Sequence, residues 1–227
     1  MIKKQLFALI VTLSFTATYT RGQNLDTLLD KSQEILEKGR IFSTKGIGLA
    51  FPAGDISSVL RPRFSSEIGL QVLFKNPRYF IYPALDYLNY KYDQNALDPD
   101  YAYRVKNAST KFYIGTISFG VMNQIKKFRV FGSAGVGGGL VNEPRATVNT
   151  TDSEINFRSK SSFTGTFRLN AGMDYGKRTF KLFAEISYML QSKQIESYTL
   201  HTLAINVGTK TNLYRLAKSI ESIRKKR

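Results

Sequence analysis

Apolar and polar side chains alternate along FTGTFRLNAGMDYGKRTFKLFAEISYML, residues 163–190. In its first half the odd positions, from Phe163 to Tyr175, are apolar or small, whereas the even positions include Arg168, Asn170 and Asp174. A period of two residues predicts β-strands with one apolar and one polar face. The apolar face of such a sheet meets either a soluble core or lipid.

The same alternation recurs along most of the chain and predicts eight strands. Their ranges are 41–52, 63–75, 79–92, 110–122, 128–138, 162–175, 179–191 and 199–213. Each reaches the roughly 9–11 residues that a tilted membrane strand needs. Longer connections (PAGDISSVLRPR, 93–109, 139–161 and 192–198) alternate with the short turn regions KNPR, NQIKK and YGKR. This order is typical of an up-and-down barrel with both termini in the periplasm.

Turn positions predict the register of three hairpins, beginning with a type II′ turn centred on Gly176 and Lys177. The predicted partners are Met173/Phe180, Arg168/Glu185 and Thr166/Ser187 in this hairpin, Val72/Ile81 and Ile68/Leu85 across KNPR, and Val121/Phe128 and Ile117/Gly132 across the fourth turn region. All three hairpins then keep one continuous apolar face. On the polar face Arg168 gains the opposite charge that a buried cation requires.

Two arrangements satisfy the pattern: a soluble, lipocalin-like calyx with the apolar face inward, and a membrane barrel with that face outward. The polar face is rich in Gly, Ser, Thr and Asn and carries few charges, which favours a barrel interior over a solvated sheet. Aromatic residues near the strand ends favour a girdle at the membrane interface. They include Tyr79, Tyr113, Tyr175, Phe180 and Tyr188, and no Trp is present. We therefore predict an all-β, eight-stranded antiparallel up-and-down transmembrane β-barrel.

The N-terminus has the layout of a secretory signal peptide, because Lys3 and Lys4 precede an apolar run that ends at Phe15. We predict a signal peptide at 1–22, a periplasmic segment with an amphipathic helix at 23–40, the barrel at 41–214 and a basic tail at 215–227. Export and a barrel together predict an outer-membrane location.

Composition excludes several kinds of chemistry. The chain has no Cys, which excludes disulfides, a thiol nucleophile and thiolate metal sites, and its single His excludes a His-rich metal site. Of the net charge of +16, the predicted signal peptide carries +3 through Lys3, Lys4 and Arg21. Basic residues of the mature chain gather at the predicted short turns and tail, where they face anionic lipid headgroups, so a nucleic-acid partner is unnecessary. This predicted periplasmic basic surface includes Lys126, Lys127, Lys177, Arg178, Arg224, Lys225 and Lys226.

Other residue patterns were weighed as candidate sites. GSAGVGGGL, at 132–140, lacks the spacing of a phosphate-binding loop and fits a barrel strand with small side chains. Asp93, Asp98 and Asp100 are candidate ligands of a weak Ca²⁺ site, although their spacing matches no twelve-residue Ca²⁺ loop and a solvated turn is the simpler interpretation. Further charges expected in the barrel interior, beside the Arg168/Glu185 pair, are Glu67, Asp86 and Arg129.

With its signal peptide, alternating strands, loop order and segments such as KGIGLAFPAGD and FRLNAGMDYG, the chain resembles the small outer-membrane β-barrels of Gram-negative bacteria, of the eight-stranded OmpA or OmpX type. The resemblance covers 41–214 and implies the fold and the outer-membrane location. It makes Tyr214 the counterpart of the aromatic residue that ends the last strand in this family. Lipid A deacylases among such barrels have a Ser two residues from a His, but here Leu203 follows His201 at that distance.

We therefore expect no catalysis and no cofactor, but a structural or surface-interaction role carried by extracellular loops. Expected partners are outer-membrane lipids, lipopolysaccharide and a protein in the periplasm or outside the cell. Open alternatives are a narrow ion or solute channel, a lipopolysaccharide-modifying enzyme and a secreted calyx for an apolar ligand.

Overall fold

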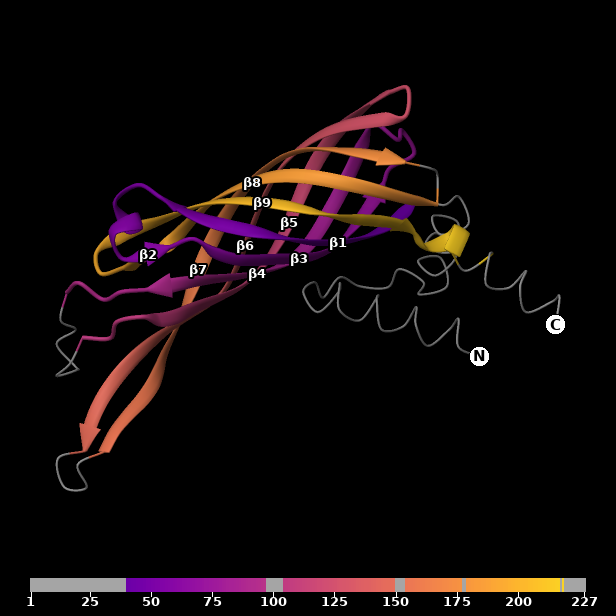
Figure 1. The fold of residues 1–227 in the computed structure, drawn as a ribbon. Coiled ribbons are helices and arrows are strands. Elements are labelled where there is room, and N and C mark those ends of the chain that lie inside the picture. The colour runs from indigo at the N-terminus through magenta and orange to yellow at the C-terminus, as the bar shows by residue number, and fades with distance from the viewer. Residues whose placement is uncertain (1–39, 97–103, 150–153, 177–178, 217, 219–227) are drawn as a thin grey trace, which may run out of the picture. The chain divides into compact units, whose positions relative to one another are not determined.

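A computed structural model describes residues 40–96, 104–149, 154–176, 179–216 and 218 (Figure 1). Eight long strands form the barrel wall. They are β1 (Ile41–Ala53), β3 (Arg63–Leu73), β4 (Tyr79–Tyr92), β5 (Ala108–Ile125), β6 (Phe128–Asn149), β7 (Glu154–Gly176), β8 (Phe180–Ile195) and β9 (Tyr198–Asn212). A 3-10 turn, η1 (Asp55–Ser58), and a short strand, β2 (Leu60–Arg61), lie between β1 and β3. The predicted helix within 23–40 and the signal peptide lie outside the described residues.

The sheet closes on itself, because each long strand pairs antiparallel with its chain neighbours, β1 pairs with β9, and β4 pairs with β5. β2 and β3 both pair with β4, and the register changes by one residue between Arg61↔Lys91 and Ser65↔Leu88. Such a change marks a bulge, which here surrounds Pro62. The closed, eight-stranded antiparallel barrel confirms the predicted fold.

The two faces of the sheet confirm the arrangement with the apolar face outward. Large apolar side chains cover the outer wall, for example Ile47, Ile68, Leu85, Ile117, Phe163, Leu182 and Val207. The buried side chains inside the barrel include Glu67, Asp86, Arg168 and Glu185. In a soluble calyx these faces would be exchanged.

Register agrees with prediction in one hairpin and differs in two. Val72 pairs with Ile81 as predicted. In the other two hairpins the strands slide by four residues, so Val121 lies opposite Gly132 and Arg168 lies opposite Met189 rather than Glu185. A shift of four, being even, leaves every side chain on its predicted face.

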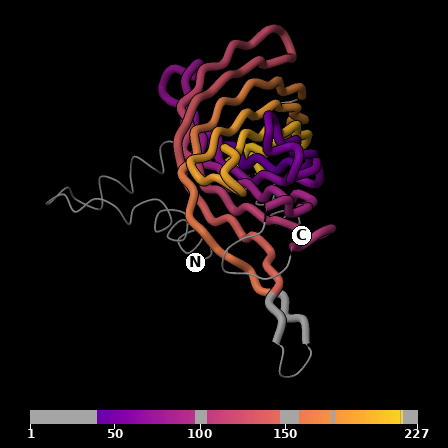
Figure 2. The backbone as a smooth tube through the Cα atoms, turned by 90° about the vertical axis from the view of Figure 1, so that its left-hand side faces the viewer, coloured from indigo at the N-terminus to yellow at the C-terminus, as the bar shows by residue number. Residues whose placement is uncertain are grey.

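Two predicted connections are wrong. Residues 139–161 are largely strand, because β6 and β7 stay paired as far as Asn149↔Glu154 (Figures 1 and 2). At 192–198 the chain makes a tight turn in which Glu196 and Ser197 both have positive φ, 49° and 71°. Tyr214 does not end the last strand either, because β9 ends at Asn212 and residues 213–216 are helical. Among the described residues, no helix is long and apolar enough to cross a membrane.

We call the end of the barrel that carries the short turns, with Ile41 and Asn212, the turn end, and the opposite end the loop end. The β6–β7 arm, defined as residues 143–149 and 154–163, extends from the loop end beyond the neighbouring strands (Figures 1 and 2). β6 pairs with β5 no further than Asn142, and β7 pairs with β8 no further than Thr166, so the arm's β6 residues have no paired strand on the β5 side and its β7 residues none on the β8 side. In outer-membrane barrels in general the short turns lie in the periplasm and the longer loops outside.

Candidate functional site

Arg168 lies at the centre of a network of buried charges inside the barrel. Its guanidinium contacts three carboxylates from three other strands: Glu67 and Asp86 at 2.6 Å each, and Glu185 at 2.9 Å. Asn170 accepts a further hydrogen bond from Arg168 Nε at 2.6 Å. The five guanidinium donors make Arg suited to joining several carboxylates at once. The network therefore links β3, β4, β7 and β8 across the barrel.

A second network lies between Arg168 and the turn end. Arg129 Nη2 contacts Asp174 Oδ2 at 2.6 Å, and Lys210 Nζ lies 3.7 Å from Asp174 Oδ1. The Lys210 ammonium also lies 3.8 Å from the centre of the Phe131 ring and 5.2 Å from that of Phe183. These two rings stabilise the buried cation through their negative faces.

The buried charges balance in number. Among the described residues, five buried carboxylates stand against five buried cations: Glu67, Asp86, Glu143, Asp174 and Glu185, and Arg129, Arg145, Arg168, Lys181 and Lys210. Apolar side chains fill the barrel on both sides of the Arg168 network. The loop-end cluster includes Ile56, Leu60, Tyr90, Tyr92, Phe112 and Leu200, and the turn-end cluster includes Phe42, Phe80, Met122 and Phe131. The interior is thus occupied by side chains along its length.

Hydrogen bonds hold the described ends of the β4–β5 connection, residues 93–96 and 104–107, at the loop end. The carboxylate of Glu196 accepts hydrogen bonds from the Ala96 N–H at 2.8 Å and the Tyr92 hydroxyl at 2.8 Å. Asp93 Oδ1 accepts from the Asn107 N–H at 2.7 Å, and Asp93 Oδ2 lies 3.5 Å from Arg61 Nε. The Asn107 hydrogen bond lowers the pKa of Asp93 against the opposing effect of desolvation, and Lys91, Arg61 and Lys106 lower it further.

These contacts bear on the proposed Ca²⁺ ligands. Both oxygens of Asp93 have partners within the protein. Asp98 and Asp100 lie outside the described residues. Within the described part of the chain, no three acidic or His side chains are grouped for a metal ion.

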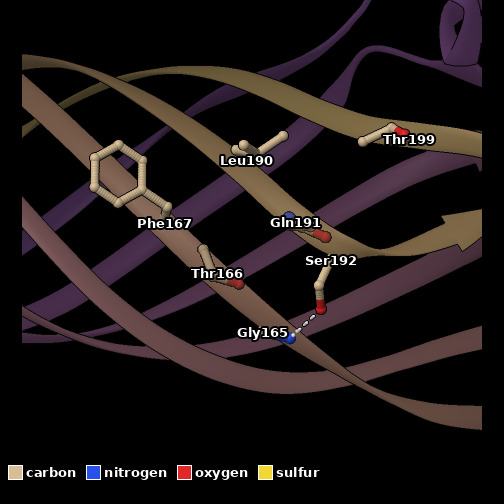
Figure 3. Close-up of a pocket in the computed structure, with 7 residues that line it drawn as sticks. All are labelled: Gly165, Thr166, Phe167, Leu190, Gln191, Ser192 and Thr199. Atoms are coloured by element: carbon tan, nitrogen blue, oxygen red, sulfur yellow. Dashed lines mark hydrogen bonds between the residues drawn. The ribbon is translucent and has the colours of Figure 1, made fainter.

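A crevice of about 410 Å³ opens where β8 leaves β7 (Figure 3). Its lining residues are Gly165, Thr166, Phe167, Leu190, Gln191, Ser192 and Thr199. Thr166↔Gln191 is the last pair of the β7–β8 ladder, and beyond it the Gly165 N–H donates to Ser192 Oγ at 2.8 Å, the bond drawn in Figure 3. The crevice therefore marks the start of the unpaired β7 edge.

The remaining predicted residues lie as follows. His201 Nδ1 is 2.5 Å from the Tyr188 hydroxyl on the outer wall. The glycine-rich stretch 132–140 lies within β6, where a Cβ on Gly137 would lie 1.9 Å from the backbone oxygen of Gly115. Lys126 and Lys127 are exposed in the turn between β5 and β6. Lys177, Arg178, Arg224, Lys225 and Lys226 lie outside the described residues.

A closed eight-stranded barrel with an apolar outer wall and a charged, internally bonded interior defines a class of protein, the transmembrane β-barrels. The chain has the fold of the small, eight-stranded members of this class.

Comparison with known proteins agrees with this class. The fold is similar to the crystal structure of Neisserial surface protein A, with a TM-score of 0.52 and 13% sequence identity over 76% of this chain and 97% of that one. Two further barrels match with lower scores. Ail, the attachment invasion locus protein of Yersinia pestis, has a TM-score of 0.37 and 14% sequence identity over 74% of this chain and 97% of that one. The N-terminal β-barrel domain of Pseudomonas aeruginosa OprF has a TM-score of 0.38 and 11% sequence identity over 75% of this chain and 97% of that one. No family model and no curated protein matches the sequence.

Sequence reasoning missed two features of the site. Lys181 was not named as an interior charge, and Asp174, although placed on the polar face, was not expected to join Arg129 and Lys210 in a network. The arm was missed because the Pro144 and Ser-rich segments of 139–161 have the composition of a loop.

Proposed function

We propose that this protein is a non-enzymatic surface-interaction protein of the outer membrane, and that the β6–β7 arm contacts its partner outside the cell. The observation that carries the proposal is the length of the arm. Its ladder continues for seven residue pairs beyond Asn142, the last β6 residue paired with β5. A two-stranded ribbon buries little apolar surface, so stabilising the barrel is not a sufficient reason for such a length.

The direction of one hydrogen bond shows which backbone N–H and C=O groups of β7 point to its free edge. The Gly165 N–H points toward β8, where it meets Ser192 Oγ. Backbone groups alternate in direction along a strand, so the odd-numbered residues of β7 all point to this side. β8 pairs no further than Gln191, so Ser159, Ser161 and Phe163 direct their backbone groups to an edge without a paired strand among the described residues.

The outer edge of β6 differs, because Pro144 lies on it. Pro144 pairs with Ser159, whose backbone groups point away from β6, so the nitrogen of Pro144 points away from β7 as well. Proline has no N–H and prevents a further strand from pairing there. The β7 edge has no proline over 158–163 and is suited to adding an extended segment of a partner there.

The proposal is tested with cells that display the protein and a panel of immobilised, purified serum and extracellular-matrix proteins. Ser161→Pro removes one N–H from the β7 edge without removing a β6–β7 hydrogen bond. Ser161→Ala, the matched control, keeps the N–H. Binding of at least one panel protein to wild-type and S161A cells, reduced about tenfold by S161P, supports a surface-interaction role; equal binding by all three cell types contradicts the arm as the contact.

We also propose the remaining domain assignments as they follow from the sequence: a signal peptide at 1–22, a periplasmic segment at 23–40 and a basic periplasmic tail at 215–227. The described barrel begins and ends at the turn end, which supports a periplasmic position for both the N-terminal segment and the C-terminal tail. Basic residues at this end, including Lys126 and Lys127, fit an anionic inner leaflet.

A further inference from the structure

Four cations gather on the outer wall near the loop end. Arg61 and Lys91 are direct cross-strand partners on β2 and β4. Lys91 lies opposite Ser109 on β5, and Lys111 is two residues along that strand, which makes it a diagonal neighbour of Lys91. Lys106 is exposed just before β5 and acts on the same carboxylate, Asp93, as Arg61 and Lys91 do. We call Arg61, Lys91, Lys106 and Lys111 the cation patch.

Acidic side chains among the described residues balance only part of the positive charge of the cation patch. Like charges directly opposite each other in a sheet destabilise it. Among the described residues, Asp93 is the acid that contacts the patch, through Arg61 at 3.5 Å, and its other oxygen is bonded to the Asn107 N–H. Within the described part of the chain, four formal positive charges therefore lie around one negative charge. An external anion placed here gains attraction from several cations at once.

A row of aromatic rings shows the depth of the patch in the membrane. Phe64, Tyr87 and Tyr113 lie side by side on β3, β4 and β5, with ring centres 6.3 Å and 5.2 Å apart. Aromatic residues of this kind mark the membrane–water interface. Lys111 is two residues from Tyr113 toward the loop end, about 7 Å along the strand. The cations thus lie just outside the apolar belt, at the level of lipid headgroups.

The cations near the loop end are unevenly spread. On β1 and β9 the outer face there carries Phe51, Ala53, Thr199 and His201, without a Lys or Arg, whereas the cation patch brings four cations together on β2, β4 and β5 and just before β5. Such a concentration of positive charge suits the phosphates of one headgroup.

We propose that the cation patch binds the phosphate groups of a glycolipid in the outer leaflet, with the acyl chains of that lipid lying along the apolar wall beneath the aromatic row. This surface is separate from the β6–β7 arm and takes a lipid rather than a protein. Lys91 and Lys111 contact the phosphates from neighbouring strands. Arg61, held in place by Asp93, provides the third cation.

The test uses the full-length, processed protein in neutral detergent, titrated with bisphosphorylated lipid A and with the same lipid after its phosphates are removed. Native mass spectrometry counts the bound lipid, and gels run without boiling follow the unfolding midpoint on heating. We expect tight binding of the phosphorylated lipid only. In the double variant K91Q/K111Q its affinity falls at least tenfold, because each surface cation contributes to the attraction of anionic lipid.

The matched control is K75Q/K126Q, which removes the same charge from exposed residues at the turn end. It should bind phosphorylated lipid A as the wild type does. Equal losses in the two variants, equal binding of the dephosphorylated lipid, or displacement of the lipid by millimolar inorganic phosphate would each overturn the proposal. Lys111→Gln alone, at an exposed position, provides a second variant if the double one folds poorly; its affinity should lie between those of the wild type and the double variant, and wild-type affinity would count against the patch.

Discussion

At the scale of single residues, Arg168 and its acidic partners are not equivalent. Arg168 is the cation that contacts Glu67, Asp86 and Glu185, whereas each of those acids is one of three around it. Removing a carboxylate leaves the guanidinium with two partners. Removing the guanidinium leaves three carboxylates close together in a site without solvent, which is the more costly change.

Arg168→Met should therefore destabilise the barrel by about 3–5 kcal/mol, the range for breaking a buried ion pair by removing one partner. Glu185→Gln should cost about 1 kcal/mol, because the amide still accepts a hydrogen bond. Urea unfolding in lipid vesicles, followed by gels run without boiling, measures both. Equal costs would show that Arg168 is not the centre of the network.

Asp93 predicts a pH dependence at the loop end, outside the membrane. Its folded-state pKa is lowered, chiefly by the Asn107 N–H, so its carboxylate stabilises the β4–β5 connection above the unfolded pKa of about 3.9. This stabilisation is lost as the pH falls through the folded-state pKa. Asp93→Asn should speed hydrogen exchange at the Asn107 amide at pH 7 and have little effect at a pH below the folded-state value. An effect of D93N that persists unchanged into acid would contradict the charge-based explanation.

At the scale of elements, the sequence predicts faces more reliably than turns. Alternation placed Glu67, Asp86 and Arg168 inside because the period of two is set by the backbone itself. The turn between β5 and β6 was misplaced because its first residue is Lys126, with φ of 57°, a conformation that favours Gly or Asn. The tight turn between β8 and β9 was missed for the same reason, because Glu196 and Ser197 occupy its positive-φ positions.

Contacts across the barrel lie beyond the reach of the sequence. Arg168 and Glu185 form an ion pair although Glu185 lies opposite Gly172, not Arg168. Because long side chains reach across the interior, Arg168 and Glu185 form the predicted ion pair although the predicted strand register was wrong by four residues. The meeting of Arg168 with Glu67, 101 residues away, depends on closure of the barrel, which strand patterns alone do not specify.

The arm should be dispensable for folding. Replacing residues 148–155 with Asn-Gly joins Thr147 to Asn156, a hydrogen-bonded pair of the ladder, through a turn that two-residue hairpins favour. The unfolding midpoint on heating should stay within a few degrees of the wild type, because the removed pairs contact neither β5 nor β8. A large drop in the midpoint would mean that the arm supports the barrel, and would weaken its assignment as an interaction element.

At the scale of the whole molecule, packing argues against the alternative of an ion channel. An eight-stranded barrel has an interior just wide enough for its own side chains. Three consecutive layers occupy it here: the loop-end apolar cluster, the Arg168 network, and the turn-end cluster with Lys210 between Phe131 and Phe183. An ion crossing the barrel must displace all three.

The purified protein in planar bilayers should accordingly show no steady conductance. The double variant Tyr90→Ala/Phe112→Ala thins the loop-end cluster, where these rings pack edge to face at 5.5 Å, but leaves the Arg168 network in place. It should remain closed as well, although less stable by several kcal/mol, because each truncation removes a large buried ring. A lasting open state in the wild type would contradict the filled interior. An open state in the variant alone would identify the loop-end cluster as the sole barrier, and would show that the charge network beneath it yields to ions.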